Sequence, residues 1–152
     1  MAGPIDYSPW WGADYLGDPH STPWTWYVSG IEASTIQEAI DAATAGDTVY
    51  VSPGVYDENI SIGKALTLIG LDDGSKAVAT ISPTAAGGTA VIVNSDDVTI
   101  EGFTITYPLG LRAIVSTDHN QLAIRDNLIT SIGTATTTGY VHAIAVVCNN
   151  AD

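Results

Sequence analysis

Cysteine and positive charge are what this 152-residue chain has least of. Cys148 is its one cysteine, which excludes a disulfide framework and a zinc site built from several cysteines. The chain has 17 acidic residues but only four basic ones, Lys64, Lys76, Arg112 and Arg125, so its formal net charge is −13. Nucleic acids and anionic membranes are bound through clustered Lys and Arg, so neither is expected as a partner.

Long hydrophobic runs are also missing. No apolar run approaches the roughly 18 residues of a membrane-spanning helix, so membrane insertion is not expected. The first 20 residues lack the basic start and apolar stretch of a signal peptide. Hydrophobic residues nevertheless make up 45% of the chain, and Thr, Val, Ile, Gly and Asp are plentiful. This composition supports a packed core and is typical of a β-rich, turn-rich protein.

Three segments of the chain repeat one pattern. Leu68, Ile100 and Ile124 occupy the same position in it, at spacings of 32 and 24 residues (68 to 100 and 100 to 124). Repeats of this length built from short strands predict a solenoid, because one unit cannot bury its apolar face alone. The repeating segments are 64–70, 97–105 and 121–129.

Residues 34–45 are predicted to form a helix, because apolar side chains recur at 36, 39, 40 and 43. Gly46 is placed to end it. Two capping boxes are available at its start: Ser34 with Gln37, and Thr35 with Glu38.

Strands are predicted from there to the end of the chain, and the last repeat stops in mid-coil. An immunoglobulin-like sandwich also uses short strands and turns, but it does not predict near-identical repeats. The predicted strands are 48–51, 55–62, 65–69, 79–81, 89–93, 98–106, 112–115, 122–130 and 142–147. The expected inward stacks are Leu66/Val98/Leu122, Leu68/Ile100/Ile124, Ile105/Ile129 and Ile92/Ile114/Ile144.

Taken in order, residues 35–49, 53–60 and 66–70 resemble the opening of pectin-lyase-like proteins. The resemblance implies an all-β fold, a right-handed parallel β-helix with one N-terminal capping α-helix. It also places Asn127 where such proteins stack an asparagine ladder, although Phe103 fills the equivalent position one coil earlier.

The aromatic-rich opening block, residues 5–11, is similar to the closing coil of periplasmic copper-binding (NosD-like) and other surface β-helix proteins. This resemblance implies a large, modular, exported parent and an extracellular or cell-surface location. We therefore expect an irregular leader over residues 1–33, the tail of a preceding domain, and a cap helix with the first coils of a β-helix over 34–152.

The catalytic patterns of the resembled enzymes are not found in this sequence. The methylesterases need paired aspartates with flanking glutamines and an arginine, and no Gln-Asp-Thr motif occurs. The lyases need a catalytic Arg or Lys beside Ca²⁺-binding acids, and Arg112 and Arg125 lie in different strands without such acids. His20, His119 and His142 show no metal-ligand spacing. No complete active site is expected.

Two binding sites remain as hypotheses. The aromatic residues of the leader could stack on sugar rings, or could instead clamp the helix cap. The acids of successive turns could align as Ca²⁺ ligands, although Asp and Asn are also the ordinary residues of turns. The aromatic candidates are Trp10, Trp11, Trp24, Trp26 and Tyr27, and the Ca²⁺ candidates are Asp96, Asp97, Asp118 and Asn120.

The sequence therefore favours a non-catalytic structural or glycan-contacting module of a larger secreted or cell-surface protein, with polysaccharide as the candidate ligand. The alternative is the N-terminal part of a polysaccharide-active lyase or esterase whose catalytic coils lie further along. No cofactor other than Ca²⁺ is suggested. Self-association is expected through the C-terminal coil, where Ile144 and Val146 would face water.

Overall fold

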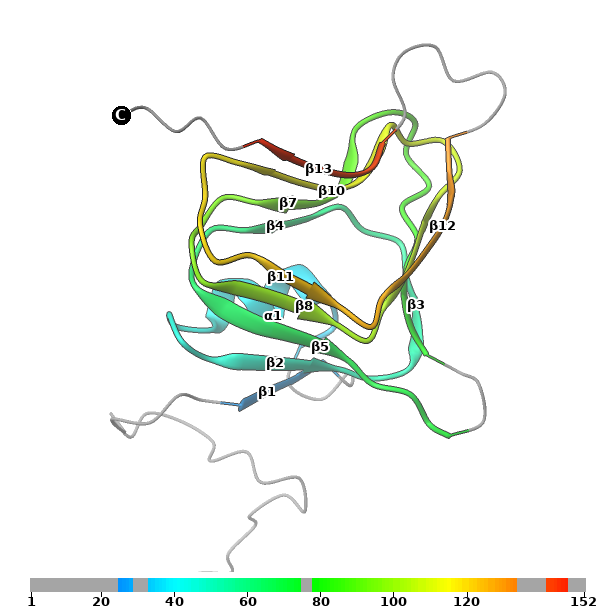
Figure 1. Ribbon diagram of the computed structural model, residues 1–152. Coiled ribbons are helices and arrows are strands. Elements are labelled where there is room, and N and C mark those ends of the chain that lie inside the picture. Colours follow the sequence, from blue (N-terminus) through cyan, green and yellow to red (C-terminus); the bar gives the residue numbers. More distant parts are fainter. Residues whose placement is uncertain (1–24, 29–32, 75–77, 134–141, 148–152) are drawn as a thin grey trace, which may run out of the picture.

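A computed structural model shows a parallel β-helix with one short helix, described over residues 25–28, 33–74, 78–133 and 142–147 (Figure 1). The strands form three sheets in which every pairing between named strands is parallel. The first sheet has the order β1 (Thr25–Val28), β2 (Thr48–Val51), β5 (Leu66–Gly70), β8 (Val98–Glu101), β11 (Ala123–Arg125). The second has the order β3 (Gly54–Tyr56), β6 (Ala79–Ile81), β9 (Thr104–Tyr107), β12 (Leu128–Ile132). The third has the order β4 (Ile60–Ile62), β7 (Thr89–Val93), β10 (Arg112–Thr117), β13 (His142–Val147).

The chain visits the three sheets in turn, and each circuit is one coil. Coil 1 contains β2, β3 and β4; coil 2 contains β5, β6 and β7; coil 3 contains β8, β9 and β10; coil 4 contains β11, β12 and β13. The all-β solenoid predicted from the repeats is confirmed. In Figure 1, strands of the same sheet lie beside one another although they are far apart in sequence.

Three segments predicted as single strands are each two strands joined by a corner. Residues 55–62, 98–106 and 122–130 break between β3 and β4, β8 and β9, and β11 and β12. The backbone turns a corner at Gly102 (φ 79°) and Asp126 (φ 53°), left-handed conformations that continuous strands do not contain. A side chain at Gly102 would place its Cβ against the carbonyl oxygen of Gly70 in the preceding coil, so glycine permits this close approach.

The predicted register of the core is largely confirmed. Leu68 pairs with Ile100, and Ile100 with Ile124, in one inward column. Ile105 lies between Ile81 and Ile129 in another. Leu66 pairs with Val98, and Leu122 packs against the core from the next coil.

One predicted stack is right for Ile114 and Ile144 and wrong for Ile92. Ile114 pairs with Val91 and Ile144, whereas Ile92 pairs with Val115 and is 38% exposed on the outside of the solenoid. The strand around Ile92 has apolar residues at 90, 91, 92 and 93, so its sequence shows no alternation from which to assign the inward face.

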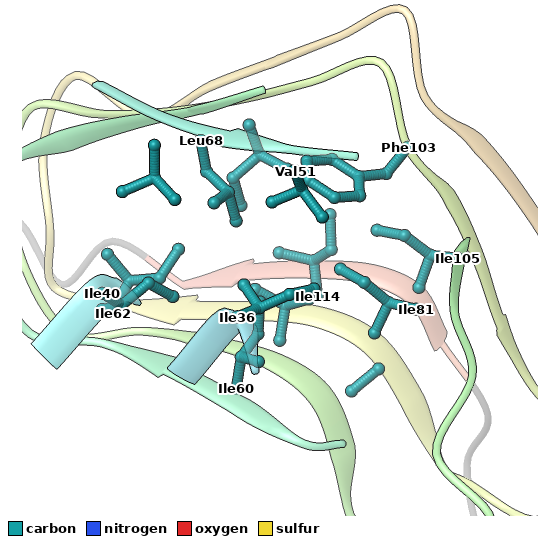
Figure 2. Packing of buried hydrophobic residues seen from close by; sticks show 14 of the residues in the cluster. Ile36, Ile40, Val51, Ile60, Ile62, Leu68, Ile81, Phe103, Ile105 and Ile114 are labelled. Atoms are coloured by element: carbon teal, nitrogen blue, oxygen red, sulfur yellow. The ribbon is translucent and has the colours of Figure 1, made fainter. Parts of the chain in front are cut away.

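The core occupies the interior of the solenoid. Figure 2 shows Leu68 of the first sheet, Ile105 of the second and Ile114 of the third packed toward one interior, with Ile36 and Ile40 from the helix. These side chains have no more than about 1% exposure. The three strand residues are each paired with an aliphatic neighbour in the next coil, about 4.8 Å away at the spacing of paired strands.

The helix α1 (Ile36–Ala42) covers the core below coil 1 and is shorter than the predicted 34–45. Thr35 is its N-cap, and the capping box with Glu38 is the second of the two that the sequence offered. The helix ends before Gly46, because the backbone of Ala43 is already extended; Gly46 (φ 95°) forms the turn that leads into β2.

The segment expected as an irregular leader contains β1. Its four residues pair with β2 as a further parallel strand of the first sheet. The apolar residues of this segment show no regular spacing, and the strand is placed by its backbone pairing with β2. The boundary between a leader and the β-helix at residue 33 remains a prediction.

Candidate functional site

The aromatic candidates are only partly within the described residues. Trp10, Trp11 and Trp24 lie outside them. Trp26 and Tyr27 belong to β1, in register with Val49 and Tyr50 of β2. Sugar stacking by these five residues therefore remains a prediction.

Two of the Ca²⁺ candidates, Asp96 and Asn120, meet across two successive coils. The amide of Asn120 donates to Asp96 Oδ1 at 2.7 Å, and His119 Nδ1 lies 3.5 Å from the same oxygen. The amide of Asp97 donates to the carbonyl of Asn120 at 3.1 Å. Asp97 and Asp118 have left-handed backbones (φ 56° and 58°), a conformation that Asp tolerates in turns.

These contacts give the Asp96 carboxylate a structural role, because it joins the turn after β7 to the turn after β10. Within the described ranges, no group of three or more His, Cys, Asp or Glu side chains is arranged to hold a metal ion. The Ca²⁺ assignment to Asp96, Asp97, Asp118 and Asn120 remains a prediction.

The richest polar cluster lies at the corner between β3 and β4, and the sequence interpretation missed it. Glu58 accepts hydrogen bonds from the amides of Ile36 (2.8 Å) and Gln37 (3.0 Å), so it caps the first turn of α1. Asp57 accepts from the amide and the hydroxyl of Thr84, both at 2.7 Å. The hydroxyl and the amide of Thr84 lower the pKa of the Asp57 carboxyl. Three consecutive polar residues, Asp-Glu-Asn at 57–59, were the available signal.

Side-chain amides join neighbouring coils at two corners. Asn127 accepts from the amide of Phe103 (2.9 Å) and donates to the carbonyl of Ile100 (2.8 Å), so it bridges coils 3 and 4. Asn59 donates to the carbonyl of Thr89 at 2.7 Å, from coil 1 to coil 2. The position suggested for Asn127 thus has a clear structural role. The amide of Phe103, whose side chain fills the equivalent position, is the donor in that bridge.

The two arginines compared with the catalytic Arg or Lys of the lyases lie on different sheets. Arg125 of β11 pairs with Glu101 of β8 at 3.2 Å on the outer side of the first sheet. Arg112 begins β10 in the third sheet, in register with Thr89 and His142. The structure therefore does not bring the arginines together.

Threonines form columns on the outer faces of two sheets. On the first sheet Thr48, Thr67 and Thr99 follow one another in register. On the second sheet Thr80 pairs with Thr104, and a separate column pairs Thr106 with Thr130. All are at least partly exposed, so their hydroxyl groups line the outside of the solenoid at the spacing of the strands.

Comparison with known proteins gives one similarity. No family model matches the chain, and no solved structure matches it. A cell surface glycoprotein of Methanothermus fervidus is 39% identical over 72 residues, which are 46% of this chain and 11% of that protein. The described part of the chain contains no helix long and apolar enough to cross a membrane. Part of this chain is therefore similar to a cell-surface protein.

Proposed function

We propose that this chain is a non-catalytic β-helix module of a larger cell-surface glycoprotein, in which it acts as a rigid scaffold. The observation that carries the proposal is the use of its polar side chains. Glu58, Asp57, Asp96 and Asn127 each bind backbone amides of another coil or of α1. Groups that would otherwise serve as acids, bases or ligands thus join one part of the solenoid to another. The similarity to a cell surface glycoprotein supports the location.

Contact with a polysaccharide is the finer part of the proposal. The threonine columns on the first and second sheets provide hydroxyl groups, each a donor and an acceptor, at a regular spacing of about 4.8 Å. Tyr50 lies on the outer side of the first sheet and is partly exposed beside these columns. Such a face suits an uncharged polysaccharide better than an anionic one, because the chain has a net charge of −13.

The location is tested on intact cells that produce the parent protein. An antibody raised against this chain should label unpermeabilised cells, and protease added outside should remove the signal. Labelling that appears only after permeabilisation would contradict the proposal.

The absence of catalysis is tested on the purified chain. We expect no release of unsaturated product or methanol from pectin, polygalacturonate or alginate, with and without Ca²⁺, because the described residues hold no matched acid and base. Turnover clearly above the buffer rate would favour the alternative of a polysaccharide-active enzyme.

A further inference from the structure

One surface corner combines a modification motif with an exposed side chain. The chain has six asparagines, and Asn59 alone is followed two positions later by a serine or threonine, in Asn59-Ile60-Ser61. Asn-X-Ser/Thr with X other than proline is the acceptor motif for N-linked glycans on exported proteins. The motif spans the end of the corner and the start of β4.

The fold presents the two polar residues of this motif to solvent. Asn59 and Ser61 are both exposed, whereas Ile60 between them is 1% exposed and belongs to the core. Alternate residues of a strand point to opposite faces, so burial of Ile60 directs Ser61 outward. The motif is thus fixed to the scaffold by Ile60. Ser61 is also bonded to Gln37 through its backbone and to Asn94 through its hydroxyl, while Asn59 remains exposed.

The Asn59 nitrogen is also compatible with a covalent substituent. Nδ2 carries two hydrogens, and one of them is donated to the carbonyl of Thr89 at 2.7 Å. Among the described residues no second acceptor is bonded to this nitrogen. A glycosylated amide keeps one N–H, so the hydrogen bond to coil 2 and the sugar linkage can coexist.

Asn127 provides the contrast within the same fold. Both ends of its side-chain amide are bonded inside a corner, to Phe103 and Ile100. The residue two positions after Asn127 is Ile129, which has no hydroxyl.

We propose that Asn59 is an acceptor for an N-linked glycan, an inference that rests on the proposed function as an exported surface module. The donor is an oligosaccharide attached through phosphate to a lipid. Asn59 Nδ2 forms a bond to the anomeric carbon of the first sugar, and the bond from that carbon to the phosphate oxygen breaks. The lipid phosphate leaves with the electron pair, and a base of the transferase takes the proton from Nδ2. The glycan lies on coil 1, so it leaves the strand edges of coil 4 uncovered.

The test expresses the full chain behind a secretion signal in eukaryotic cells, followed by glycopeptide mass spectrometry before and after peptide N-glycosidase treatment. We expect a glycan at Asn59 and none at Asn94, an exposed asparagine at another corner that lacks the motif. Ser61→Ala should abolish the modification while Asn59 is retained, and Ser61→Thr should preserve it. Asn59→Gln should abolish it as well, and its thermal melt shows whether the fold survives loss of the bond to Thr89.

Secretion of the chain with Asn59 unmodified overturns the inference. If the chain is retained in the cell, folded chain from a cytosolic preparation is incubated with an oligosaccharyltransferase and a lipid-linked oligosaccharide, and an unmodified Asn59 there overturns it equally. An unmodified Asn59 in a parent protein that still labels on intact cells leaves the proposed function standing. Labelling confined to permeabilised cells contradicts the function itself.

Discussion

At the scale of single residues, Ser116 is a polar exception inside an aliphatic column. It pairs with Val93 on one side and Val146 on the other, and Val93 pairs with Ile62. Its side chain is fully buried, and its hydroxyl oxygen has no hydrogen-bond partner in the described part of the chain. A buried hydroxyl without a partner costs about 1–3 kcal/mol, because it has lost its water.

Ser116→Ala should therefore stabilise the protein by about 1 kcal/mol, since it removes the unpaired oxygen and leaves only a small void. Urea unfolding followed by circular dichroism measures the change. Thr117→Ala is the matched control, because Thr117 is exposed on the same strand, and it should alter the free energy of unfolding by less than about 0.5 kcal/mol. A lower stability for Ser116→Ala would show that the hydroxyl has a partner in solution.

At the scale of elements, α1 both covers the core and occupies the edge of β4. The side-chain amide of Gln37 accepts from the amide of Ser61 at 2.8 Å and donates to the carbonyl of the same residue at 3.2 Å. It thereby makes the two bonds that a neighbouring strand would make. Lys64 donates to the carbonyl of Ala43 at 2.6 Å and binds the other end of the helix to the solenoid.

Gln37→Ala should expose the outer edge of β4 and cost about 1–2 kcal/mol, because two backbone groups of Ser61 lose their partners. Hydrogen exchange at the Ser61 amide is the direct measurement and should become much faster. Gln37→Glu keeps an acceptor oxygen, so it should retain most of the protection at this amide. Equal exchange rates in wild type and Gln37→Ala would show that α1 does not protect the edge.

At the scale of the whole molecule, the two ends of the solenoid differ. The core of coil 1 is closed by α1, whereas the last strands of the three sheets in the described chain are β11, β12 and β13. Ile144 of β13 is 43% exposed although its register partner Ile114 is fully buried. Among the described residues no strand pairs with the outer edges of β11, β12 and β13, and the Ile144 side chain is exposed beside them.

We expect a second copy to cover this face, because two identical ends related by a twofold axis close the assembly. The net charge of −13 opposes association, but salt at about 0.15 M limits that repulsion to roughly 8 Å. Sedimentation at tens of micromolar should show a dimer that Ile144→Asp dissociates. Ile92→Asp is the matched control, because Ile92 is a comparably exposed isoleucine of the same sheet but points away from the core. A monomer in wild type would rule out this mode of association.

Much of the fold could be predicted because the repeats carry strong periodic signals. Leu68, Ile100 and Ile124 recur in the same local pattern, and that pattern directly sets the register. Around Ile92 successive residues are all apolar, so the sequence does not show which of them point into the core. The corners were missed because a change of direction depends on backbone angles at one residue, such as Asp126, rather than on hydrophobic periodicity.

The polar corners were harder to predict than the core. Glu58 caps a helix that begins 22 positions earlier, and no local motif announces a partner at that distance. Asp96 and Asn120 come into contact because both follow strands of the same sheet in successive coils.

The closure of coil 1 by α1 also affects the order in which the coils form. A chain delivered from its N-terminus presents β1, the helix and β2–β4 first, and each later circuit adds to the row of strand edges left by the circuit before it. Assembly therefore proceeds coil by coil away from α1. On the proposed export through a narrow channel, this order would favour folding on the far side of the membrane and oppose backward movement of the chain.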